Sequence, residues 1–157
     1  MPADKSSQRV QQALLAHGLT CVVQELSDST RTAADAAAAL GCEVAQIAKS
    51  LVFKDAADGT ALLIIASGAN RVDEARVGEL LSTRIVKADA DYVRGMTGYA
   101  IGGVPAVGHR EALTTIIDRD LLQYDTIWAA AGTPHSVCEI PSHELAALTG
   151  GRVADIA

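Results

Sequence analysis

The segment from residue 47 to residue 67 constrains the fold of this chain more than any other. From Ile47 to Phe53, large apolar residues alternate with other residues, which is the period of a β-strand. Asp58-Gly59 supplies the chemistry of a tight turn, and residues 60–67 form a second strand-like run. The centre of that run, residues 62–65, is continuously apolar, as is typical of a central strand covered on both faces. The sequence therefore predicts a β-hairpin at the middle of a covered sheet.

The rest of the chain mixes helices and strands without a regular alternation. Capping residues, glycines and apolar patterns predict helices over residues 6–16 (capped by Ser6 or Ser7), 33–40, 73–82, 90–96 and 141–149. Strands are predicted over residues 20–26, 84–86, 114–118, 126–130, 136–140 and 152–156. This order favours an α/β chain of the α+β type, with a mixed, mostly antiparallel sheet or partial barrel surrounded by helices. Without a repeat or linker, one domain over residues 1–157 is expected.

Charge and composition exclude several classes of protein. The formal net charge of -6 argues against a DNA-binding or anionic-membrane protein, because such proteins use a basic face. The first residues lack the apolar segment of a signal peptide, and no apolar stretch is long enough to span a membrane. Three dispersed cysteines without a CxxC pair fit free thiols in a reducing compartment. We therefore expect a cytoplasmic protein.

A local contact with the end of an RNA stays compatible with this charge. Five basic residues of the middle stretch offer at most a modest patch, and the alternative is a solvated surface of mixed charge. These residues are Arg71, Arg76, Arg84, Lys87 and Arg94.

Lys49 lies within the first strand pattern of the hairpin. On the strand period it falls on the face of Leu51 and Phe53, where a core side chain is expected. Lysine is rarely buried without a partner, so a charge there needs an anion or a ligand. The alternative is a strand-end lysine whose amine reaches water. The pattern alone leaves both interpretations open.

Two loops of small residues are candidates to line a pocket with Lys49. The loop over residues 98–109 contains four glycines, which allow positive φ angles and leave backbone N–H groups free for a carbonyl oxygen or a phosphate. It matches neither the P-loop nor the Rossmann pattern. The loop over residues 131–136 follows a predicted strand and places His135 where it can form a rim. Each loop is also compatible with a plain connection.

The chain carries no signature of a metal site or of an activated nucleophile. The four histidines show neither HExxH nor any close ligand spacing. A GxSxG elbow is missing, and the cysteines have no local pattern of a catalytic thiol. We therefore expect neither a cofactor nor a metal.

Taken in order, four segments of the chain resemble the YbaK/prolyl-tRNA-synthetase-associated editing domain family. The resemblance runs from about Thr32 to Ala157, and each segment is weak alone. The segments are residues 47–53, residues 97–105, Ile117-Asp118 and residues 131–135.

The resemblance implies a free-standing aminoacyl-tRNA deacylase, which hydrolyses the ester of a mischarged tRNA. The typical substrate is tRNA for proline carrying a small wrong amino acid such as alanine, cysteine, serine or threonine. Implied partners are the acceptor end of aminoacyl-tRNA and prolyl-tRNA synthetase. The rival hypothesis is a non-catalytic module that binds a synthetase or an aminoacyl-adenosine-like ligand.

The resemblance also implies site residues. The key lysine of the family maps onto Lys49, which we predict as the catalytic cation. The glycine-rich substrate loop and the second loop map onto further positions, and the predicted substrate-binding residues are Ser50, Gly102, Gly103, Pro105, Gly132 and His135. The chain has Pro105-Ala106 where the family often has Pro-Pro. It also has residues 133–135 where the cysteine-clearing branch carries a basic stretch, so members that clear alanine or other small residues are more similar.

Overall fold

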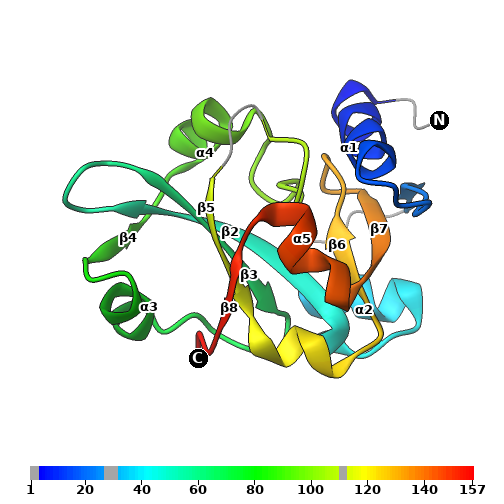
Figure 1. Ribbon diagram of the computed structural model, residues 1–157. Helices are drawn as coiled ribbons and strands as arrows, with labels where there is room; N and C mark the ends of the chain where they lie inside the picture. Colours follow the sequence, from blue (N-terminus) through cyan, green and yellow to red (C-terminus); the bar gives the residue numbers. More distant parts are fainter. Residues whose placement is uncertain (1–3, 27–31, 110–112) are drawn as a thin grey trace.

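The computed structural model describes residues 4–26, 32–109 and 113–157, and Figure 1 shows the arrangement of their helices and strands. The strands are β1 (Gln24–Glu25), β2 (Ile47–Asp55), β3 (Ala61–Ser67), β4 (Ile85–Lys87), β5 (Thr114–Asp118), β6 (Thr126–Ala130), β7 (Ser136–Pro141) and β8 (Arg152–Ala154). The helices are α1 (Lys5–Ala16), α2 (Ala33–Leu40), α3 (Glu74–Leu80), α4 (Ala90–Thr97) and α5 (Leu145–Thr149). Three short 3₁₀ helices complete the chain: η1 (Val44–Gln46), η2 (Arg119–Gln123) and η3 (Ser142–Glu144).

The described strands form one mixed sheet in the order β1-β7-β6-β2-β3-β5-β8, with β4 paired to β2. The β2–β3 hairpin is antiparallel and registers Ala48 with Ser67 and Lys54 with Ala61. β2 pairs with β6 in parallel, and β3 pairs with β5 in parallel. The end strands β1 and β8 do not meet, so the sheet stays open. A mixed sheet with helices around it confirms the predicted α+β class.

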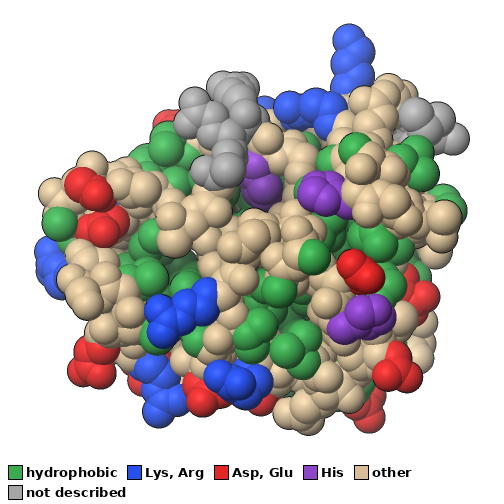
Figure 2. Space-filling view, in the orientation of Figure 1, with side chains coloured by type: hydrophobic (Ala, Val, Ile, Leu, Met, Phe, Trp, Pro, Cys, Tyr) green, Lys and Arg blue, Asp and Glu red, His purple; other side chains and the backbone are tan. Residues whose placement is uncertain are grey.

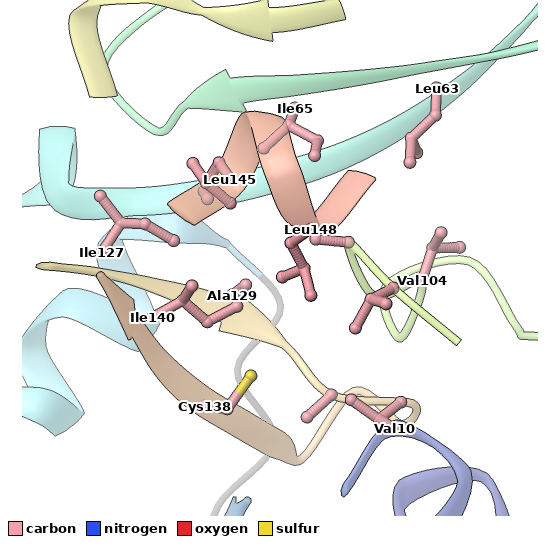
Figure 3. Packing of buried hydrophobic residues seen from close by; sticks show 14 of the residues in the cluster. Val10, Leu63, Ile65, Val104, Ile127, Ala129, Cys138, Ile140, Leu145 and Leu148 are labelled. Carbon is pink, nitrogen blue, oxygen red and sulfur yellow. The ribbon is translucent and has the colours of Figure 1, made fainter. Parts of the chain in front are cut away.

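β3 is the covered central strand that its apolar run predicts. Leu63 and Ile65 belong to a large core cluster on one face of the sheet, to which α5 contributes Leu145 and Leu148. Figure 3 shows these side chains together, with Val10 of α1 at the edge of the same cluster. The alternate residues of β3, Leu62 and Ile64, belong to a second cluster on the other face. There they pack with Val77, Ile85 and Ile116.

Helix capping follows the sequence closely except at the first helix. Thr32 caps α2 as predicted, because its hydroxyl accepts a hydrogen bond from the Asp35 N–H at 3.1 Å. The predicted Ser6 or Ser7 cap of α1 is wrong. Asp4 caps this helix instead, because its carboxylate accepts from the Ser6 N–H at 2.7 Å.

The first predicted strand and the last predicted helix are among the elements that differ from the structure. Only residues 24–25 of the predicted strand over residues 20–26 pair with β7. The Gln11 side chain of α1 takes the preceding backbone, because its amide donates to the Cys21 carbonyl and accepts from the Val23 N–H, each at 2.8 Å. The predicted helix over residues 141–149 is divided into η3 and α5.

The core position of β3 leads to a stability prediction. Ile65→Ala should lower the free energy of unfolding by about 2–5 kcal/mol, because the substitution leaves a cavity where Ile65 is fully buried. Leu15→Ala is the matched control, since Leu15 is 54% exposed on α1 and should change stability by less than about 0.5 kcal/mol. Urea denaturation followed by circular dichroism measures both. Equal midpoints for the two variants would contradict the assigned core.

Candidate functional site

A pocket with a volume of about 800 Å³ opens beside the middle of β2. Its size lies within the range of ordinary small-molecule sites, roughly 300–1,000 Å³. Side chains from α2, β2, the glycine loop and the end of β6 line it, and most are small and apolar. Lys49 and Lys87 are the charged residues of the lining, which contains neither Asp nor Glu among the described residues. The pocket therefore favours a ligand with anionic or oxygen-rich groups.

Three of the seven predicted site residues line this pocket: Lys49, Ser50 and Gly102. Gly103 and Pro105 are buried behind the wall, and Gly132 is buried against α1. His135 is exposed and is not part of the lining, although its neighbours Pro134 and Ser136 are.

Lys49 is half-buried and directly follows the buried residues Ile47 and Ala48 at the start of β2. Its Nζ donates a hydrogen bond to the backbone carbonyl of Asn70 at 2.8 Å. Burial lowers the pKa of the Lys49 ammonium, the nearby Asp118 carboxylate partly offsets that effect, and Arg71 lowers the pKa further. The Asn70 carbonyl thus anchors the Lys49 side chain. The strand pattern alone left open whether this lysine has a partner or reaches water.

Asp118 and Asn70 support Lys49 and were not predicted as site residues. Asp118 is 1% exposed, and one of its oxygens accepts from the Ser67 N–H and from the Asn70 side-chain amide, both at 2.9 Å. The Asn70 amide also donates to Asp120 at 2.7 Å. A carboxylate at the last position of the apolar strand β5 is a signal that the sequence offers for Asp118. No local pattern identifies Asn70, because it acts through its backbone carbonyl.

The two predicted loops meet backbone to backbone. The Gly132 N–H donates to the Gly103 carbonyl at 2.9 Å. A Cβ atom at position 103 would lie 2.8 Å from the Thr133 Cα, so only glycine allows this approach. The Gly103 N–H donates to the Ala100 carbonyl at 3.0 Å, so it is already bonded within the loop. Gly102, at φ 88°, is the loop glycine that faces the pocket.

Helix α1 holds both loops in place. The Ser7 hydroxyl donates to the Ser136 hydroxyl at 2.8 Å, and Ser136 is bonded in turn to the Thr133 hydroxyl at 2.7 Å. Arg9 reaches the other loop, where it donates to the Gly98 carbonyl at 3.2 Å and lies over the Tyr99 ring at 4.7 Å. The distance between the two loops therefore depends on a helix that is remote in sequence from both.

His135 and His109 make hydrogen bonds within the two loops. The His135 N–H donates to the Thr133 hydroxyl at 3.2 Å, and its carbonyl accepts from the Leu26 N–H, so its backbone shapes the loop. A ring nitrogen of His109 lies 2.7 Å from the Pro105 carbonyl, which ties Pro105 into the loop. Burial lowers the pKa of His109. Among the described residues, no group of three or more His, Cys, Asp and Glu is placed to hold a metal ion.

Neither the cysteines nor the charged side chains of the visible face form a further site in the part of the chain that the structure describes. All three cysteines are free, and burial raises the pKa of the Cys138 thiol to about 12. In the face shown in Figure 2, Lys and Arg side chains are interspersed with acidic and apolar ones. Within the described parts of the chain, no helix has the length and apolar character needed to cross a membrane.

Comparisons with known proteins give one family and several similar chains. The family model described as "Aminoacyl-tRNA editing domain" matches residues 27–148. The uncharacterized protein YwhH of Bacillus subtilis (strain 168) is 28% identical over 131 residues, which cover 83% of each chain. A solved structure described as a "putative trans-editing enzyme for prolyl tRNA synthetase" is 46% identical, with a TM-score of 0.92 over 99% of this chain and 98% of that one. The hypothetical protein APE2540 is 32% identical, with a TM-score of 0.87 over 94% of this chain and 98% of that one.

The close approach of the loops can be tested at Gly103. Gly103→Ala should lower the free energy of unfolding by about 1–3 kcal/mol, because its methyl group would overlap the Thr133 backbone. Gly95→Ala is the matched control, since Gly95 lies within α4 with open space around its Cα and should gain about 1 kcal/mol. Thermal and urea denaturation measure both variants. A Gly103→Ala protein as stable as the Gly95→Ala protein would contradict the described packing.

The support of Lys49 by Asp118 predicts a change in titration. Asp118→Asn should lower the pKa of Lys49 further, because it removes the negative charge that favours the ammonium. NMR titration of protein labelled at the lysine side chains measures this pKa directly. Asp155→Asn is the control, since Asp155 is exposed and pairs with Arg119. An unchanged or raised Lys49 pKa in folded Asp118→Asn protein would show that Asp118 does not support the charge.

Proposed function

Because this chain belongs to the aminoacyl-tRNA editing domain family, we propose that it is a deacylase acting in trans, which hydrolyses the ester of a mischarged tRNA. The observation that carries the proposal is the Lys49 ammonium, held by the Asn70 carbonyl at the wall of a pocket of about 800 Å³. The proposed substrate is tRNA for proline that carries a small wrong amino acid: alanine, serine, threonine or cysteine. The similar structure described as a "putative trans-editing enzyme for prolyl tRNA synthetase" supports this choice of tRNA.

The chemistry is the hydrolysis of the ester between the amino acid and the terminal ribose. Attack on the ester carbon by water, which gives up a proton as its oxygen bonds to that carbon, forms a tetrahedral oxyanion. The bond to the ribose oxygen then breaks, that oxygen takes a proton, and the free amino acid leaves. A positive charge near the carbonyl lowers the barrier because negative charge develops there in the transition state.

Lys49 suits the part of an electrostatic stabiliser and not that of a general base. A free lysine has a pKa of about 10.4, and the Asp118 carboxylate counteracts the lowering that burial causes. The hydrogen bond that Nζ donates to the Asn70 carbonyl at 2.8 Å is stronger for the ammonium than for the neutral amine, so it also favours the charged form. The backbone of Gly102, which faces the pocket at a positive φ, is the proposed second contact to the substrate oxygens.

The apolar character of the wall suits a small side chain without charge, such as that of alanine. Alanines from α2, β2 and β6 line the pocket together with Val52 and Val104. A hydrophobic pocket separates substrates that differ by one methylene by only about 1–3 kcal/mol, so neighbouring small amino acids should be hydrolysed at related rates. His135 stays a proposal as a residue of the rim, because its side chain is exposed next to Pro134 of the lining.

Contact with tRNA should centre on the acceptor end. The net charge of -6 argues against a broad contact with the tRNA body, and on the face shown in Figure 2 the basic side chains are interspersed with acidic ones. We therefore propose prolyl-tRNA synthetase as a partner that brings the mischarged tRNA to this protein, within the cytoplasm.

Substitution of Lys49 tests the proposed mechanism. For any mischarged tRNA that the wild-type protein hydrolyses, Lys49→Ala should lower the deacylation rate by about 100- to 1000-fold. This is the usual effect of losing one oxyanion-type contact. Lys54→Ala is the matched control on the same strand, because Lys54 packs over Tyr92 and does not line the pocket. A panel of tRNAs carrying alanine, serine, threonine or cysteine, followed by release of the labelled amino acid, measures both variants.

Two results would contradict the proposal. Turnover at the wild-type rate in a folded Lys49→Ala protein would remove Lys49 from the mechanism. Binding of an aminoacyl-adenosine mimic without turnover of any tRNA in the panel would identify a binding module instead of an enzyme.

A further inference from the structure

Along one edge, the middle of β2 has no partner among the strands that the structure describes. β6 pairs with β2 at Ile47 and Ala48, and β4 pairs with it from Phe53 to Asp55. Residues 49–52 lie between these two pairings, and all four line the pocket. A strand edge carries N–H and C=O groups that pair readily with another extended segment.

The hairpin shows which residue directs its backbone to this edge. The Ile47 carbonyl accepts from the Gly68 N–H at 2.7 Å, and the Asp55 N–H donates to the Thr60 carbonyl at 2.9 Å, so odd-numbered residues of β2 bond toward β3. Successive residues of a strand direct their N–H and C=O groups to opposite sides. Ser50 therefore points its N–H and C=O toward the open edge. Ala56, which has the same parity, donates to the Arg84 carbonyl on that side at 2.8 Å.

The Ser50 side chain adds a third polar group. Its Oγ is buried and has no hydrogen-bond partner among the described residues. Buried polar atoms are nearly always paired in native proteins, so an unpaired hydroxyl in the wall of a pocket indicates a missing ligand or water. The backbone of the next residue, Leu51, pairs with Ile64 of β3. Leu51 is therefore a paired reference residue on the same strand.

The aminoacyl end of the proposed substrate complements the Ser50 edge. Like one residue of a strand, an aminoacyl ester carries an N–H donor and a C=O acceptor on the two sides of one Cα atom. Two residues that face each other across an antiparallel pair exchange both bonds, from each N–H to the opposite C=O.

We propose that the open edge at Ser50 binds the aminoacyl group as one added residue of the sheet. The Ser50 N–H donates to the ester carbonyl oxygen, and the Ser50 carbonyl accepts from the α-amine. This inference rests on the proposed function and adds how the substrate is recognised at the same pocket.

The pairing makes the amine itself a determinant of specificity. The lining offers Lys49 and Lys87 but no carboxylate, so a hydrogen bond to a carbonyl replaces a salt bridge to the amine. A primary amine can rotate an N–H toward the Ser50 carbonyl whatever its side chain. In proline the ring replaces one N–H and fixes the direction of the remaining ones. Correctly charged proline would thus be disfavoured independently of its size.

Substrates that differ only at the amine test this pairing. We compare tRNA charged with alanine, with N-methylalanine and with a propionyl group, and divide each enzymatic rate by the spontaneous hydrolysis rate of that ester. The propionyl ester should lose about 5- to 100-fold relative to alanine, because the Ser50 carbonyl loses its donor, and N-methylalanine should lose less, because it keeps an N–H while its methyl group crowds the strand edge. Equal relative rates for the three esters would overturn the pairing while leaving the proposed deacylase in place.

Substitution at Ser50 separates its backbone from its side chain. Ser50→Pro removes the N–H, a change that strand edges tolerate, and should slow alanyl-tRNA hydrolysis by about 5- to 100-fold. Ser50→Ala keeps the N–H and C=O, so it should keep the preference for alanine over N-methylalanine. Loss of that preference in Ser50→Ala would assign the recognition to the hydroxyl and overturn the backbone pairing.

Amide hydrogen exchange tests the pairing without turnover or substitution. In the free protein, the Ser50 N–H should exchange faster than the Leu51 N–H, which is bonded to β3. Saturation with 3′-alanylamino-3′-deoxyadenosine, a mimic that is not hydrolysed as an ester, should slow exchange at Ser50 by at least about tenfold. If the mimic does not bind, or binds without protecting Ser50, the pairing is overturned. A mimic that protects Ser50 while no mischarged tRNA is hydrolysed would uphold the pairing and reject the deacylase.

Discussion

Strand β2 is bonded to three other strands, and the positions of those pairings shape the site. β3 accompanies it along the hairpin, whereas β6 and β4 pair only with its beginning and its end. The hairpin is held rigid because its partner β3 is buried on both faces. The gap between β6 and β4 leaves room for a pocket, with a strand edge as part of its wall. A rigid strand with one unpaired stretch thus positions both Lys49 and Ser50.

The charge of Lys49 depends on a balance between burial and a carboxylate. Desolvation disfavours the ammonium, and Asp118 favours it from behind Asn70. The carboxylate can be buried there because backbone and side-chain donors surround it, including the Ser67 N–H at 2.9 Å. Lys49 bonds to the Asn70 carbonyl and not to Asp118 itself. The ammonium is therefore oriented but not neutralised by direct ion pairing, which leaves its charge available to a ligand.

The opposite wall of the pocket depends on contacts of glycine with backbone. Gly103 lies against Thr133, and Gly132 lies against the Ser6 backbone of α1, at distances that would exclude a Cβ atom. Buried hydroxyls of Ser7 and Ser136 connect the same helix to the second loop. Helix α1 precedes the segment that matches the family model, yet it sets the position of loops within that segment. The shape of the pocket is consequently a property of the whole sheet and helix assembly.

Local patterns in the sequence determined the elements and the face of Lys49. Alternation placed Lys49 with Leu51 and Phe53, and the apolar run of β3 required cover on both sides. The resemblance to the editing family directed attention to the glycine loops. Local patterns failed at residues 20–23, because the Gln11 side chain offers that backbone hydrogen bonds which compete with pairing in a sheet.

Only the tertiary structure decided which of the candidate residues share a pocket. His135 shares a loop with the lining residues Pro134 and Ser136, but its side chain is exposed, and no sequence pattern fixes that direction. The support of Lys49 by Asn70 acts through a backbone carbonyl, which every residue type carries. The open edge at Ser50 arises where two strand pairings stop, and pairing length depends on contacts between segments far apart in the chain. Periodicity and capping are local and are written in the sequence, whereas loop spacing and free strand edges result from packing at long range.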